Sequence, residues 1–172
     1  MSDAEGLPIL PHTAGEFYAW LWWASELQGA TFDLPEPVGR IDLWVDERLA
    51  FRTADDTKLI AVMTGENPAA TLEARAALAN GKVLQEMRVG IRRDEREFLV
   101  TFKGPAAHLQ AVRLPQVVNE GGEEVLYDRI HLYEELCFVV QGLFCEFAGV
   151  RTSASWSDEV LPALQGWILG RS

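Results

Sequence analysis

The chain has little cysteine, and it lacks the long apolar runs that mark membrane proteins and signal peptides. Its two cysteines, Cys137 and Cys145, do not form a CxxC pair, and they lie eight residues apart on a predicted helix. That distance is too great for a disulfide bond, so we expect both to be reduced. No apolar run reaches the roughly 18–20 residues of a membrane span. The N-terminus lacks a basic stretch before an apolar segment, which argues against a secretory signal and favours the cytoplasm.

Signatures of catalysis are absent as well. The sequence contains no phosphate-binding GxxxxGKS/T, no GxGxxG after a strand, no HExxH and no GxSxG. The histidines, His12, His108 and His131, are scattered along the chain, and we interpret His131 as a satisfied residue at the core boundary. We therefore predict a protein that is not an enzyme, with no catalytic residues, no metal site and no cofactor.

The cysteines and the paired carboxylates also favour structural interpretations. A nucleophilic cysteine needs a nearby base, and no histidine has a suggestive spacing, so we expect Cys137 to lie in the core with Cys145 beside it. Adjacent carboxylates such as Glu134-Glu135 diverge by about 100° around a helix and cannot share a proton. We interpret such pairs as solvated charges.

The sequence does contain enough apolar material for one core, together with an uneven charge. Hydrophobic residues make up 48% of the 172 residues and charged residues 24%, as in a typical globular domain. We predict a flexible tail over residues 1–13 and one domain over 14–172. The net charge of −11 predicts repulsion from nucleic acid and anionic membranes. Residues 82–113 differ, since they carry seven basic and four acidic side chains.

Hydrophobic periodicity predicts an α+β fold. Helices are expected over about 16–27 and 71–80, the second with Asn67 and Pro68 at its start and Gly81 as a left-handed cap. Residues 32–37 are expected to form an extended linker. Alternation predicts a hairpin over 40–53 with a turn at Asp46-Glu47 and a clearer hairpin over 86–103. The wholly apolar run 59–63 predicts a central strand, and a short strand is expected over 109–114. We therefore predict antiparallel hairpins forming a sheet, packed by a long amphipathic helix and two or three shorter helices.

The long amphipathic helix follows a polar loop at 119–124. Apolar residues recur in it at alternating spacings of four and three: Leu126, Ile130, Tyr133, Cys137, Val140, Phe144 and Phe147. Leu132, Leu136, Val139 and Leu143 widen this face. So broad an apolar face must be covered by the sheet or by another subunit. A last helix over about 157–169 is expected to begin at a capping Ser157 followed by two acidic residues.

The hairpin over 86–103 admits two interpretations. Its apolar phase is expected to face the core: Met87, Val89, Ile91, Phe98, Val100 and Phe102. The opposite phase presents Arg88, Arg92, Thr101 and Lys103, with Arg93 and Arg96 at the turn. Such a face could contact phosphates without reading base sequence. In the ordinary alternative, which the spacing alone favours, these cations pair with Glu86, Asp94, Glu95 and Glu97.

Three tryptophans lie within four positions of the first helix. At about 100° per residue, Trp20 falls on the core face, Trp23 at its edge and Trp22 nearly opposite. Stacking on nucleic-acid bases would require nearby cations, whereas the neighbours here are acidic. We predict that Trp22 packs against a second subunit or against the C-terminal helix, and we assign Trp22, Trp23 and Trp167 to an interface.

The order of these segments resembles that of a known family. The stretches EFYAWLWWASE, TFDL, EARAALANGKVLQEMRV, REFLVTFKG, AVRLP and YDRIHLYEELCFVVQGLF are similar to the C-terminal half of the RdgC family of recombination-associated DNA-binding proteins. The resemblance covers about residues 16–149. It implies a non-enzymatic, cytoplasmic protein whose relatives form a ring-shaped homodimer around duplex DNA, without sequence preference, and limit recombinase access. By position, Lys82, Arg88, Arg92, Arg93 and Lys103 would contribute to such a surface, and we add Arg96 from the hairpin turn.

Two departures from this family bear on function. The family's N-terminal half has no counterpart here, so a ring of the same kind would need an oligomer or a separate protein partner. The net charge of −11 also weakens binding to phosphates. The first functional hypothesis is an RdgC-like accessory protein that binds duplex DNA, lies with the nucleoid in the cytoplasm and modulates recombination. The alternative is an acidic protein–protein interaction module that keeps the fold without binding DNA.

Overall fold

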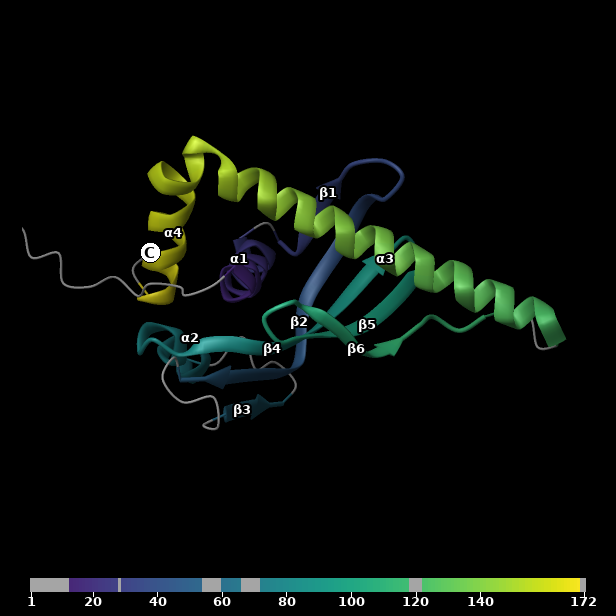
Figure 1. Cartoon of the computed structure of the whole chain (residues 1–172), viewed down its shortest axis with the longest axis horizontal. Coiled ribbons are helices and arrows are strands. Elements are labelled where there is room, and N and C mark those ends of the chain that lie inside the picture. Colours follow the sequence, from purple (N-terminus) through teal and green to yellow (C-terminus); the bar gives the residue numbers. More distant parts are fainter. Residues whose placement is uncertain (1–12, 28, 54–59, 66–71, 118–121, 171–172) are drawn as a thin grey trace, which may run out of the picture.

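One antiparallel sheet organises the chain in the computed structural model, which describes residues 13–27, 29–53, 60–65, 72–117 and 122–170 (Figure 1). The helices are α1 (Thr13–Leu27), α2 (Leu72–Ala79), α3 (Gly122–Thr152) and α4 (Leu161–Ile168), the last preceded by a π-helical turn, Trp156–Val160. The strands are β1 (Thr31–Leu34), β2 (Gly39–Arg52), β3 (Ile60–Thr64), β4 (Val83–Arg93), β5 (Arg96–Lys103) and β6 (His108–Arg113). The predicted α+β class is confirmed. The predicted tail lies outside the described residues, apart from Thr13, which begins α1.

The sheet has the order β1-β2-β4-β5-β6, with β3 paired to β2 beside this path. The predicted hairpin over 40–53 is wrong, because β2 is one strand of 14 residues. Its partner β4 follows it from the pair Asp42–Arg92 to the pair Arg52–Val83, with a register shift after Val45. The polar pair that suggested a turn therefore lies at a bulge, where residues 46–48 of β2 stand opposite Arg88 alone and interrupt the ladder without reversing the chain.

Two further strand predictions need correction. Part of the predicted linker, Thr31–Leu34, is strand β1, and it pairs with the first residues of β2. The apolar run that predicted a central strand forms β3, which pairs with β2 through Ile60–Thr64 and carries an exposed Val62. The apolar composition of this run thus overstated its burial. The prediction of a strand over 109–114 is confirmed by β6.

The hairpin of β4 and β5 confirms the clearest prediction. Arg93 pairs with Arg96 across its turn, and Asp94 adopts a positive φ of 54° there. All six side chains of its apolar phase are fully buried. The end of α2 is also as predicted. Gly81 has a φ of 77°, and the backbone N–H groups of Gly81 and Lys82 donate to the carbonyls of Leu78 and Ala77, 2.9 and 3.0 Å away, which is the double bond of a Schellman motif.

Helices α1 and α3 lie on one side of the sheet, and α4 packs against α1 (Figure 1). Phe17 at the centre of α1 is fully buried. Its ring stacks on Phe144 of α3 with centroids 4.1 Å apart, and it meets Phe102 of β5 edge-on at 5.8 Å. The aromatic ring of one α1 residue thus joins the sheet to the C-terminal half of α3.

The C-terminal helical segment begins earlier than predicted. Trp156 opens the π-helical turn and is buried, so Ser157 lies inside this turn and is not a cap. Among the described residues no single helix has the length and apolar composition of a membrane span. Helix α3 and the segment Trp156–Ile168 meet that test only together, as a pair bent by 87°.

Candidate functional site

The cations of the β4–β5 hairpin are paired with carboxylates across the sheet. Arg92 Nη2 lies 3.0 Å from Asp42 Oδ2 on β2. Arg88 Nε lies 3.0 Å from Asp46 Oδ2, as an ion pair whose N–H is not aligned for a hydrogen bond. Because β4 side chains alternate and Met87, Val89 and Ile91 fill the core, these two arginines point to the face of the sheet away from α1 and α3.

Glu86 completes this arrangement farther along β4. Its two carboxylate oxygens accept Arg48 Nε from β2 at 2.6 Å and approach Lys103 Nζ of β5 at 3.7 Å. Charges of opposite sign therefore alternate across β2, β4 and β5, an arrangement that stabilises neighbouring strands. Thr101, predicted on the exposed phase, is instead buried beside this ladder.

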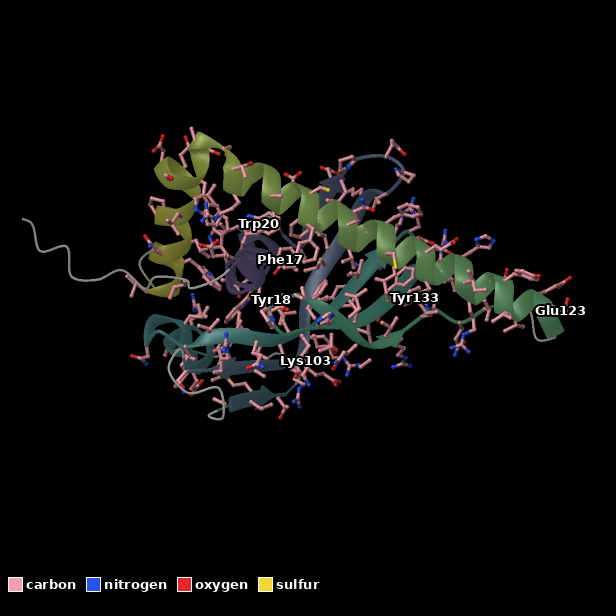
Figure 2. The ribbon with its side chains drawn as sticks, viewed as in Figure 1. Phe17, Tyr18, Trp20, Lys103, Glu123 and Tyr133 are labelled. Atoms are coloured by element: carbon pink, nitrogen blue, oxygen red, sulfur yellow. The ribbon has the colours of Figure 1, made fainter. Side chains whose placement is uncertain are left out.

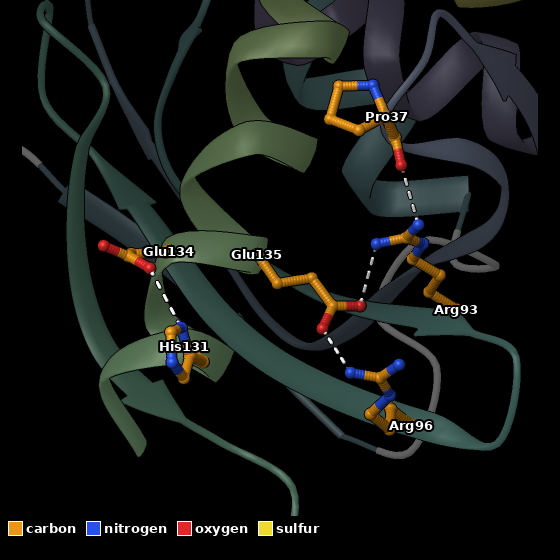
Figure 3. Close-up of polar contacts among 6 residues, drawn as sticks. All are labelled: Pro37, Arg93, Arg96, His131, Glu134 and Glu135. Carbon is orange, nitrogen blue, oxygen red and sulfur yellow. Dashed lines mark hydrogen bonds and ion pairs between the residues drawn. The ribbon is translucent and has the colours of Figure 1, made fainter. Parts of the chain in front are cut away.

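The hairpin turn is tied to α3 by a third carboxylate (Figure 3). Glu135 Oε1 accepts a hydrogen bond of 3.1 Å from Arg93 Nη1, and Oε2 accepts one of 2.5 Å from Arg96 Nη1. Arg93 Nη2 also donates to the carbonyl of Pro37 at 2.8 Å. Only 11% of the Glu135 side chain is exposed, so its interpretation as a solvated charge is wrong. Its neighbour Glu134 is exposed and lies 3.3 Å from the ring of His131.

Five of the six candidate DNA-binding residues are therefore neutralised within the chain: Arg88, Arg92, Arg93, Arg96 and Lys103. The sixth, Lys82, is half-buried and has no carboxylate within 4 Å among the described residues. Lys82 precedes β4 while Arg93 ends it, a separation of roughly 35 Å at the rise of a strand. The structure does not gather the six cations into one free patch.

The tryptophans assigned to an interface lie mainly inside the chain. Trp22 is fully buried, and its ring meets Trp167 of α4 edge-on with centroids 4.9 Å apart. Both indole N–H groups donate to the Glu26 carboxylate at 2.8 Å. Of the two predicted partners of Trp22 the C-terminal helix is the one observed, and a contact of its side chain with another molecule is excluded by its burial. Trp23 and Trp167 are half-buried at the edge of the core.

The residues considered for catalysis or metal binding are dispersed. His108 is exposed on β6, and His131 is exposed rather than at the core boundary; His12 lies outside the described residues. Cys137 and Cys145 are both free and exposed, so the prediction of core cysteines is wrong. Within the described part of the chain, no group of three or more His, Cys, Asp or Glu side chains could hold a metal ion.

The apolar stripe of α3 divides into a packed half and an exposed half. Val140, Phe144 and Phe147 pack on α1 and the core, as predicted. The first half is packed through a different set of side chains, led by Leu132 and Leu136. The predicted stripe there points to solvent. Figure 2 shows this half of the helix, from Glu123 at its free end to Tyr133.

We call the exposed residues of this half the α3 face. They are Leu126, Tyr127, Ile130, Tyr133, Cys137 and Phe138, and the five large ones among them are each 44–59% exposed. The spacing of the stripe had indicated that a cover is needed. What the sequence could not show is that the sheet covers the neighbouring side of the helix instead, because that depends on how α3 is rotated about its axis.

Shallow grooves adjoin this half of α3. The segment that follows β6 runs beside it, and one groove, of about 480 Å³, is lined by Val112–Val117 and Arg129. Another, of about 270 Å³, lies between this segment and α3 and includes Arg96, His131 and Glu135. The side chains that line these grooves show no convergent catalytic set. The grooves make the surface next to the α3 face concave.

Comparison of the chain with models of protein families, with curated proteins and with solved structures found no significant match. The resemblance to the RdgC family therefore rests on the sequence pattern alone, and function has to be argued from the surface.

Proposed function

We propose that this protein is a non-enzymatic interaction module that binds another protein through the α3 face. The observation that carries the proposal is the exposure of this face. Since a large apolar or aromatic side chain offers on the order of 150–250 Å², the exposed parts of its five large residues amount to roughly 500 Å². The largest apolar patch on a typical monomer is of about this size, 300–600 Å², and is often functional.

The composition of the face also supports protein binding. Two tyrosines and a phenylalanine lie on it, namely Tyr127, Tyr133 and Phe138, and aromatic residues are enriched at the centres of protein interfaces. The fold does not need these side chains, because Leu132, Leu136, Val139 and Leu143 already provide the contacts of α3 with the core. Their apolar character is therefore explained by an external partner.

The test of this function is partner capture with a matched pair of variants. The purified chain is immobilised, incubated with a lysate of its source cells and treated with a short cross-linker, and the cross-linked peptides are identified by mass spectrometry. Ile130→Glu places a charge on the face, whereas Ala148→Glu places one at an exposed position farther along α3. We expect cross-links to residues 126–138 in the wild type and in Ala148→Glu, and their loss in Ile130→Glu. Cross-links that avoid this segment would refute the proposal.

A second candidate function is RdgC-like binding of duplex DNA with modulation of recombination. The observation that favours it is the exposure of the ion pairs on the far face of the sheet, where 54% of the Arg92 side chain and 45% of Lys103 are accessible. Exposed ion pairs contribute only about 0.2–1 kcal/mol each. These cations could therefore exchange their carboxylates for phosphates of a polyanion.

A mobility-shift assay at low salt decides this candidate. Wild type is compared with Arg92→Glu/Lys103→Glu, and with Arg151→Glu as a control cation on α3 that is paired with Glu16. DNA binding predicts a shift that the double variant loses and the control keeps, with affinity falling steeply as salt rises. Absence of a shift, or an equal shift for all three proteins, eliminates this function.

A further inference from the structure

We infer that the partner of the α3 face is the same face of a second copy of this chain, with the two α3 helices antiparallel. This inference rests on the proposed function, because it identifies the protein that covers the face. It is drawn from the spacing of the exposed residues, their symmetry, the charges beside them and the area available.

The spacing indicates that the partner is a helix. Leu126, Ile130, Tyr133 and Cys137 follow one another at intervals of four, three and four, the repeat that aligns one helix with another in a coiled-coil contact. The same repeat continues into Val140, Phe144 and Phe147, which pack on helix α1 and the core. The second half of the seam is thus covered partly by a helix inside the chain, while the first half is exposed.

The exposed half is also complementary to itself. A two-fold axis that crosses α3 between residues 131 and 132 brings Leu126 opposite the partner's Cys137, and Ile130 opposite the partner's Tyr133. Each large side chain then faces a smaller one, twice per dimer. This is the self-complementarity that an isologous two-fold interface requires.

Charge selects the antiparallel direction. At about 100° per residue, Glu123 in the first turn of α3 flanks the seam, whereas Glu124 and Asp128 point away from it, Asp128 into the adjoining groove. A parallel pair would place Glu123 beside the same carboxylate of the partner, and like charges at such a distance repel. In the antiparallel pair Glu123 lies level with residue 140 of the other helix, inside the uncharged stretch 136–145.

The area is sufficient for a two-fold dimer. Because each copy contributes roughly 500 Å² of large side chains, two copies bury about 1,000 Å² before their flanking residues are included, which reaches the lower bound of a specific interface. The free end of α3 projects beyond the strands in Figure 1, so a second helix can lie along it. Arg113 and Gln116, exposed beside this half of α3 in the adjoining grooves, supply a polar rim.

Disulfide trapping tests both the contact and its direction. In a Cys145→Ser background Cys137 is the single thiol, and Leu126→Cys adds a second one opposite the partner's Cys137. The two positions are 11 residues apart on one helix, about 16 Å, so no disulfide can form within a chain. We expect mild oxidation to give a covalent dimer of Leu126→Cys/Cys145→Ser, while Cys145→Ser alone stays monomeric on a non-reducing gel. Removing Cys137 from the double variant should abolish the covalent dimer.

Sedimentation without cross-linking completes the test. We expect the mass of a dimer, twice 19.2 kDa, for the wild type and the mass of a single chain, 19.2 kDa, for Ile130→Glu. Equal cross-linking of Cys145→Ser alone would show a parallel contact and overturn the inference. A wild-type mass of 19.2 kDa at high concentration, with no cross-link, would overturn it as well. If that result accompanies capture of a different protein at residues 126–138, the proposed function stands and only the identity of the partner is wrong.

Discussion

Glu135 is the residue whose removal has the most specific consequence, because its carboxylate joins the β4–β5 turn to α3 through two ion pairs. We consider Glu135→Gln, which keeps the shape of the side chain and removes its charge. The change takes the ionised acceptor away from Arg93 and Arg96, which donate to it at 3.1 and 2.5 Å. A hydrogen bond to a charged group contributes about 1.5–3 kcal/mol, and the more exposed Arg96 contributes less, nearer to 0.2–1 kcal/mol.

We therefore expect Glu135→Gln to lower the free energy of unfolding by about 2–3 kcal/mol. Urea unfolding followed by tryptophan fluorescence measures this change, since six tryptophans report on the core. For a urea dependence of about 2 kcal/mol per M, the midpoint falls by roughly 1 M. The matched control is Glu134→Gln, whose side chain is exposed and lies 3.3 Å from the ring of His131. A surface change of that kind stays within about 0.5 kcal/mol.

Equal midpoints for Glu135→Gln and Glu134→Gln would refute the reasoning, because the pair at the hairpin turn would then be no stronger than a surface contact. The same variant informs on nucleic acid. It frees two arginines, so a protein that binds DNA through this hairpin should bind more tightly when Glu135 is neutral. Unchanged mobility of DNA with this variant would agree with the interaction module.

Two further predictions concern the sheet. Gly90 faces Trp44 across β2 and β4, and a Cβ added there would overlap the Trp44 ring, so Gly90→Ala should lower the free energy of unfolding by about 1–3 kcal/mol. Gly149→Ala, in open space on α3, should raise it by up to about 1 kcal/mol. A higher urea midpoint for Gly90→Ala than for Gly149→Ala would contradict the packing. Arg92, followed by Thr31, donates hydrogen bonds that hold the pKa of Asp42 below its ordinary value. The stability that Asp42 provides is therefore complete above the ordinary carboxyl pKa and is lost as pH falls through the lowered one. Below about pH 4, the free energy of unfolding of Asp42→Asn should therefore fall less steeply with decreasing pH than that of the wild type. The same dependence on pH in both proteins would count against this prediction.

Local patterns in the sequence predicted the parts of the fold that depend on neighbouring residues. The β4–β5 hairpin was found because Met87, Val89 and Ile91 alternate with polar residues, and a strand with one buried face must alternate. Gly81 was identified as the end of α2 because only a left-handed residue closes a helix in that way. These features need no knowledge of the rest of the chain.

The features that were missed depend on residues far apart in sequence. The cations of the hairpin were expected to pair with Glu86, Asp94, Glu95 and Glu97. Glu86 does pair with Lys103, but the arginines pair with Asp42, Asp46 and Glu135. The first two pairings follow from the register of β2 against β4, and the third from the position of α3 over the sheet. Hydrophobic periodicity predicts neither the register of two strands nor the position of a helix over a sheet. The sequence did predict neutralisation of the hairpin and one of its partners, Glu86, but not the carboxylates that pair with the arginines.

The α3 stripe shows the same limit in another form. Its spacing of four and three was read correctly, and the need for a cover was deduced from it. The sequence contains a second apolar row, Leu132, Leu136, Val139 and Leu143, and only the tertiary structure shows that this row faces the core. The other row, which begins with Leu126 and Ile130, is left exposed in its first half and forms the α3 face.

The most direct test of the α3 face uses its own cysteine. Cys137 lies on the face, and Cys145, two turns farther along the same helix, lies outside the exposed half, while both thiols are exposed in the single chain. The measurement is the rate at which each is alkylated in the concentrated native protein. If the face is covered by a second copy, Cys137 reacts more slowly than Cys145, and the difference disappears on dilution or in Ile130→Glu. Equal rates at all concentrations would show that no second copy covers Cys137 and would contradict the proposed self-association.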